Sequence, residues 1–173
     1  PVPGWFEGSR RLTGPNRDFD APGALLEVTV ASPALCAAWE ARVRDMVARL
    51  GWPAPHLAIR TFASGASLAF TAPADQLFSA TDVAEWAWQA AATDHEAMWP
   101  HPPLPHAPAA PAAWGASLAR ETLQRFASAE ARPRELALRA EATRRGITCL
   151  VDDEALSLGT GSGSRAWPLH GLP

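Results

Sequence analysis

The run of prolines between residues 100 and 113, "PHPPLPHAPAAPAA", constrains what this chain can fold into more than any other feature. Each proline lacks a backbone N–H and fixes φ, so the run cannot continue a helix and favours extended polyproline geometry. We therefore predict a Pro/Ala-rich linker or surface strap over residues 100–116. The remainder is expected to form an α+β core over 1–99, a helical segment with short strands over 117–158 that completes the same domain, and a Gly/Ser-rich exit segment over 159–173.

The segment ahead of this run begins with strand and helix signals. "ALLEVTV", residues 24–30, contains β-branched residues and follows Pro-Gly, so it is predicted to be the first strand, in a central position. Ser32 and Pro33 are typical of a helix start, and Gly51 is typical of a helix end, which predicts a helix over 33–50. The residues spaced for its buried face are Leu35, Trp39, Val43, Met46, Val47 and Leu50.

A hairpin and a second helix are predicted next. "HLAIRTF" and "ASLAFTA" are joined at Ser64-Gly65 in a hairpin pattern. Ser79 or Thr81 can cap a helix over 81–92, with acidic residues in its first turn where the helix dipole favours them. The side chains expected to point inward are Leu57, Ile59, Leu68 and Phe70 from the hairpin and Val83, Trp86 and Ala90 from the helix.

Helical spacing resumes at Ser117, is interrupted by Pro133 and ends at Gly146. "ITCLV" and "ALSLG" then indicate two short strands around an acidic turn. The complete pattern predicts an α+β two-layer sandwich. It has a β-α-β-β-α core with an antiparallel hairpin, both core helices on one face of the sheet, further helices and a C-terminal β-hairpin.

Composition narrows the function classes. A formal net charge of −3 on 173 residues gives no general attraction to nucleic acid or to an anionic membrane. No window is apolar enough to span a membrane, and no leader pattern is present, so no membrane association is predicted. Cys36 and Cys149 are too few for a disulfide framework, which favours a reducing cytoplasm.

Two motifs resemble a nucleotide-binding loop and a metal-binding site, but each lacks residues that such a site requires. "GTGSGSR", residues 159–165, exposes backbone amides but has no lysine and no following helix, so no nucleotide site is predicted there. His95, His101 and His106 lie in an acidic neighbourhood, but Trp99 occupies the position where a zinc motif requires its second histidine. We therefore predict no cofactor and no metal in this chain.

Three stretches carry a resemblance to a known family: "RRLTGPN" at residues 10–16, the strand "ALLEV", and "RRGITCLVDDEALSLGTGSGSRAWP" near the C-terminus. Together they resemble the N-terminal region of bacterial cyanophycin synthetase-like proteins, whose chains continue into a Mur-ligase-like catalytic module. The resemblance implies a non-catalytic accessory domain of an ATP-dependent amide ligase, with ATP and Mg bound by the adjoining module. Its implied partners are that module and a polar, peptide-like substrate.

The residues assigned to substrate binding or docking are Arg10, Arg11, Gly14, Asn16 and Glu85. Arginines beside a rigid turn can offer forked donors to a carboxylate or to the partner module. The plainer interpretation is that solvated arginines precede an ordinary turn. The family pattern has two histidines on the helix that carries Glu85, and this sequence has other residues at both places.

Two further function classes stay open. A stand-alone interaction scaffold, which could be a homo-oligomer, would need only exposed tryptophans and the proline strap. A small enzyme would need an acid or a base, and Asp82, Glu85 and His95 are the available groups. Perturbed carboxylates in a pocket would favour the enzyme, and a flat apolar patch would favour the scaffold.

Overall fold

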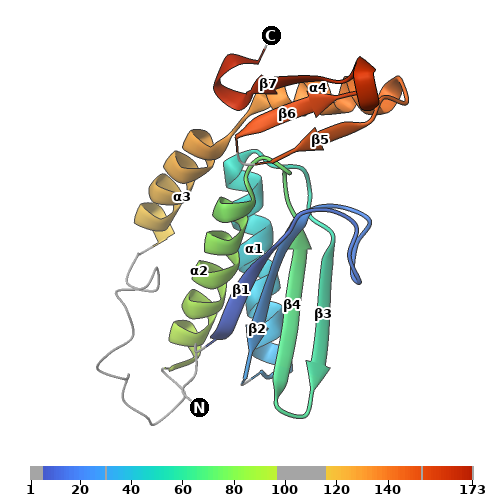
Figure 1. Cartoon of the computed structure of the whole chain (residues 1–173). Coiled ribbons are helices and arrows are strands. Elements are labelled where there is room, and N and C mark those ends of the chain that lie inside the picture. Colours follow the sequence, from blue (N-terminus) through green and yellow to red (C-terminus); the bar gives the residue numbers. More distant parts are fainter. Residues whose placement is uncertain (1–5, 30, 97–115, 153, 173) are drawn as a thin grey trace. The chain divides into compact units, whose positions relative to one another are not determined.

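The computed structural model describes residues 6–29, 31–96, 116–152 and 154–172. The fold is α+β, with four helices and two antiparallel sheets of four and three strands in these residues (Figure 1). Contacts within the chain divide it into two units, Pro1–Glu130 and Ala131–Pro173. None of the helices in the described segments is long and apolar enough to cross a lipid bilayer.

The first unit contains an antiparallel sheet in the order β1-β2-β4-β3. The predicted central strand is confirmed as β2, but it is the second strand, because residues 6–12 form an edge strand that the sequence did not reveal. A register shift between Phe6 and Gly8 interrupts the two-residue alternation that identifies strands. The strands are β1 (Phe6–Leu12), β2 (Gly23–Val28), β3 (Leu57–Phe62) and β4 (Gly65–Thr71).

Helix α1 (Pro33–Leu50) forms where local signals predict it. Ser32 is the N-cap, and its Oγ accepts a hydrogen bond of 3.1 Å from the Leu35 amide. The helix ends at Gly51, whose φ of 72° is the left-handed conformation that glycine adopts without strain. The predicted buried face is confirmed, with Leu50 half-buried at its end.

Helix α2 (Leu77–Glu96) is longer than predicted and starts earlier. Ser79 and Thr81 lie inside the helix rather than at its N-cap, so the predicted capping and the predicted acidic first turn are wrong. The first turn is instead closed by α3 (Ala116–Glu130), because its last residue, Glu130, accepts hydrogen bonds from the amides of Phe78 and Ser79. Sequence signals within α2 cannot reveal a cap that comes from another helix.

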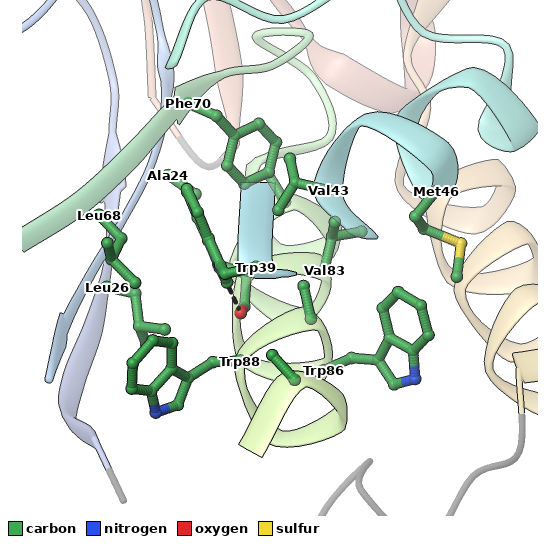
Figure 2. Packing of buried hydrophobic residues seen from close by; sticks show 14 of the residues in the cluster. Ala24, Leu26, Trp39, Val43, Met46, Leu68, Phe70, Val83, Trp86 and Trp88 are labelled. Atoms are coloured by element: carbon green, nitrogen blue, oxygen red, sulfur yellow. Dashed lines mark hydrogen bonds between the residues drawn. The ribbon is translucent and has the colours of Figure 1, made fainter. Parts of the chain in front are cut away.

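The core of the first unit lies between one face of the four-stranded sheet and the helices packed on it, as predicted. Trp39 of α1 is fully buried, and its indole nitrogen donates a 3.1 Å hydrogen bond to the carbonyl of Ala84 on α2 (Figure 2). The indole nitrogens of Trp86 and Trp88 are buried, and no described residue accepts a hydrogen bond from either. The largest fully buried sheet residues are Leu26, Val28, Leu68 and Phe70.

Two glycines allow close approach of the central strands. A Cβ atom at Gly65 would lie 1.8 Å from the carbonyl oxygen of Val28, and one at Gly23 would lie 2.1 Å from that of Phe70. Both distances are far below van der Waals contact. The β2–β4 pair therefore depends on glycine near both of its ends.

The second unit contains helix α4 (Pro133–Arg144) and the sheet β5-β6-β7. The predicted hairpin is confirmed as β5 (Cys149–Val151) and β6 (Ala155–Leu158). The segmentation differs from the one predicted in two ways. The helix after the proline run belongs to the first unit, and residues 159–173, expected to be an exit segment, contain β7 (Arg165–Pro168), which pairs with β6. The proline run itself lies outside the described residues.

Candidate functional site

The edge strand β1 and helix α2 place one predicted arginine against an aromatic ring. The guanidinium carbon of Arg11 lies 3.9 Å from the ring centre of Phe78, which is 60% exposed. On the same face of β1, the Ser9 hydroxyl donates a hydrogen bond to the Glu85 carboxylate of α2. Arg11 has no acidic partner among the residues that the structure describes. Within this part of the chain, no group accepts a hydrogen bond from its guanidinium.

Arg10 points to the opposite face of β1, because side chains alternate along a strand. Its Nη2 lies 2.6 Å from a carboxylate oxygen of Glu27 on β2, and its side chain is 67% exposed. The structure therefore does not bring the guanidinium groups of Arg10 and Arg11 together. A single carboxylate could not be held by both side chains in this arrangement.

Asn16 organises the loop between β1 and β2. Its Nδ2 donates to the carbonyls of Gly14 and Ala21, both at 3.0 Å, and its Oδ1 accepts from the amides of Asp18 and Phe19, both at 2.9 Å. An amide side chain has two N–H donors and two acceptor lone pairs, so these bonds use its full capacity. The side chain of Asn16 thus shapes the loop, with the Gly14 carbonyl as one of its partners.

The same loop is anchored to the far edge of the sheet. The carboxylate of Asp18, only 6% exposed, is 2.6 Å from Nε of Arg60 on β3. Arg60 also donates to the carbonyl of Arg17 at 3.4 Å. Strands β1 and β3 are the opposite edges of the sheet. The ion pair therefore holds the loop that follows β1 against β3, over the sheet face that the helices do not cover. The loop between β1 and β2 is therefore held in shape by polar contacts at both of its ends.

Three carboxylates meet where α2 faces β1 and α3. Burial of Asp82, with smaller contributions from the charges of Glu85 and Glu130, raises its pKa to about 6. Glu85 is held by Ser9, and Glu130 is held by the first turn of α2. Asp82 can therefore exchange a proton much closer to neutral pH than an ordinary aspartate can.

The residues proposed for a small enzyme are only partly brought together. Asp82 and Glu85 are neighbours on α2, whereas His95 lies ten residues beyond Glu85, about 15 Å along a helix that rises ~1.5 Å per residue. His101 and His106 lie outside the described residues. Within the described segments, no three His, Cys, Asp or Glu side chains are grouped as a metal site.

The residues that sequence reasoning missed are Ser9, Phe78 and Glu130. Each acts on a residue at least 51 positions away in the chain. Phe78 gave the one usable signal, because a large aromatic residue three positions before the predicted helix start at Thr81 is a candidate for exposure. No protein-family model and no curated protein matches this sequence.

Proposed function

We propose that this chain is the accessory domain of an ATP-dependent amide ligase of the cyanophycin synthetase and Mur ligase type, and that it holds a polar, carboxylate-bearing peptide substrate. The starting point is the resemblance of residues 10–16 and 144–168 to that family. ATP, Mg and the chemical step would belong to the adjoining module. This chain would contribute binding at β1.

The position of Arg11 over Phe78 carries the proposal. An arginine side chain loses about 2 kcal/mol of rotamer entropy when it is fixed, and contact with an aromatic face offsets part of that loss before a ligand binds. Five N–H donors in a planar fork suit a carboxylate. No described residue uses those donors. Arg11 is therefore a partly ordered and available carboxylate binder.

Arg10 would have a secondary part. Its guanidinium is already paired with Glu27, so a ligand carboxylate there would have to displace an existing partner. Such an exposed pair contributes only ~0–1 kcal/mol, which makes exchange possible but gives little affinity. We assign the main contact to Arg11 and a general attractive charge to Arg10.

Calorimetric titration of the full chain with hexa-aspartate at low ionic strength tests this proposal, with hexa-asparagine as the uncharged peptide. Arg11→Gln should lower the affinity for hexa-aspartate about tenfold, which corresponds to ~1.4 kcal/mol. Arg125→Gln is the matched control, because Arg125 lies over Phe126 at 5.9 Å on α3, away from β1. Equal affinities in the Arg11→Gln variant and the parent, or equal binding of both peptides, would contradict the proposal.

A further inference from the structure

The second unit contains an open pocket of about 700 Å³. Its lining residues come from the start of α4, the start of β6, strand β7 and the short helix Leu169–Gly171. This volume lies within the range of ~300–1,000 Å³ that is usual for small-molecule sites. The pocket is in a different unit from β1, so a ligand bound there would be independent of the proposed function.

Glu154 brings an exposed carboxylate to this pocket from the position just before β6. Its backbone is held on both sides, because its amide donates a 2.8 Å hydrogen bond to Asp152 and its carbonyl accepts one of 2.9 Å from Leu169. None of the described side chains donates to its carboxylate. His170, also exposed in the lining, adds a ring nitrogen that accepts a hydrogen bond when the imidazole is neutral. The pocket therefore offers acceptors on a fixed backbone.

Arg132, which carries the opposite charge in the lining, is already engaged. Its Nη1 lies 3.8 Å from a carboxylate oxygen of Glu135, and its side chain makes a further interaction within the chain. The Glu135 side chain is only 6% exposed, so its charge offsets that of Arg132 at short range. We assign Arg132 no contact with a ligand. The sign of the charge that a ligand must carry is then set by Glu154.

An indole side chain supplies an apolar wall. Trp167 is half-buried on β7, where it pairs in register with the fully buried Leu156 of β6. Pro168 and Leu169 follow Trp167 in the chain and extend the apolar lining. Aromatic rings pack against an indole with a gain beyond the buried area alone. The pocket therefore suits a ligand with a flat apolar body.

We propose that this pocket binds a small aromatic amine, a molecule with one ammonium group beside an aromatic ring. An ammonium group has three N–H donors and forms charge-assisted hydrogen bonds with a carboxylate such as that of Glu154. An uncharged apolar ligand would remove water from Glu154 without replacing its hydrogen bonds, which is costly. An anionic ligand would be repelled by the same carboxylate. The ring of the amine packs against Trp167.

The test follows the indole Nε1–H signal of Trp167 by NMR in the full chain, assigned with Trp167→Phe, during titration with phenethylamine. A saturable shift is expected. 2-Phenylethanol lacks the ammonium group, ethylamine lacks the ring and 3-phenylpropionate carries the opposite charge, so each should bind at least about fivefold more weakly. The inference is overturned if phenethylamine gives no saturable shift, or if any of these three compounds binds equally well.

Variants separate the contact with Glu154 from a general effect of charge. Glu154→Gln should weaken phenethylamine binding about tenfold, which corresponds to ~1.4 kcal/mol, and should remove most of the preference for phenethylamine over 2-phenylethanol. Glu141→Gln is the matched control, because it removes the same charge from α4 of the same unit and Glu141 does not line the pocket. Unchanged two-dimensional NMR spectra away from the pocket would show that both variants fold. Equal loss of binding in the two variants, or an unchanged preference in Glu154→Gln, would refute the contact, and the ligand series in the parent chain decides the proposal without any variant.

Discussion

The carboxylate of Glu130 should stabilise the first unit from outside the helix that it caps. It accepts three hydrogen bonds: from the amides of Phe78 and Ser79, both at 2.8 Å, and from the Ser79 hydroxyl at 2.7 Å. These amides are in the first turn of α2, where no residue of the helix can pair with them. We therefore predict that Glu130→Ala destabilises the first unit and loosens the contact between α2 and α3.

We expect Glu130→Ala to lower the free energy of unfolding by about 2 kcal/mol. Removing a helix N-cap costs ~0.5–2 kcal/mol, and a hydrogen bond to a charged group contributes ~1.5–3 kcal/mol before exposure is considered. Two effects make the destabilisation smaller than these two contributions added together. The site is partly exposed, and removal of the Glu130 charge relieves its repulsion of Asp82, whose pKa it helps to raise. Glu130→Gln keeps one acceptor oxygen and should lose roughly half as much.

Urea unfolding of the full chain measures the free-energy change, and hydrogen exchange of the Phe78 and Ser79 amides locates it. Glu121→Ala is the control, because Glu121 is an exposed acidic residue of the same helix. Its substitution should change stability by no more than ~0.5 kcal/mol. If Glu130→Ala costs no more than Glu121→Ala, or leaves exchange of the two amides unchanged, Glu130 does not act as a cap.

Asp82→Asn should stabilise the first unit by about 1 kcal/mol at pH 7 after allowance for partial exposure. The folded pKa of about 6 exceeds the ordinary 3.8, so stability is fully present below the lower value and falls as pH rises toward the higher one. Urea midpoints as a function of pH check this, and a parallel profile in the variant would contradict it. Gly65→Ala should cost about 1–3 kcal/mol because of the Val28 carbonyl, whereas Gly14→Ala, with open space around its Cβ position, should be neutral in thermal unfolding. Mg-ATP should show no micromolar binding in calorimetry, because the glycine-rich loop is followed by β7 and the chain has no lysine.

Local signals were sufficient for some elements and insufficient for others. Helix α1 could be predicted in full because Ser32, Pro33 and Gly51 act within one turn of its ends. The hairpin β3–β4 was equally local. Strand β1 was missed because its alternation is interrupted, and the start of α2 was misplaced because its cap lies 51 positions further along the chain. The division into two units depends on contacts between residues far apart in the sequence, so local sequence signals could not predict it.

The candidate site shows the same distinction. Asp82 and Glu85 are neighbours because residues three apart share a helix face, a relation that spacing alone can reveal. The role of Asn16 in its turn was also local. The contact between Arg11 and Phe78 joins residues 67 positions apart, so no spacing rule predicts it. For the same reason, the different partners of Arg10 and Arg11 could not be predicted before β1 was known to be a strand.

The distribution of tryptophan gives the molecule separate optical reporters. Trp39, Trp52, Trp86 and Trp88 are buried in the first unit, while Trp167 is half-buried in the second. The fluorescence maximum of the buried indoles should lie at shorter wavelength than that of exposed tryptophan. It should move to longer wavelength only when the first unit unfolds. Far-ultraviolet circular dichroism responds to helices in both units. Coincident transitions by the two signals would mean that the units unfold together, and separated transitions would mean that each has its own stability.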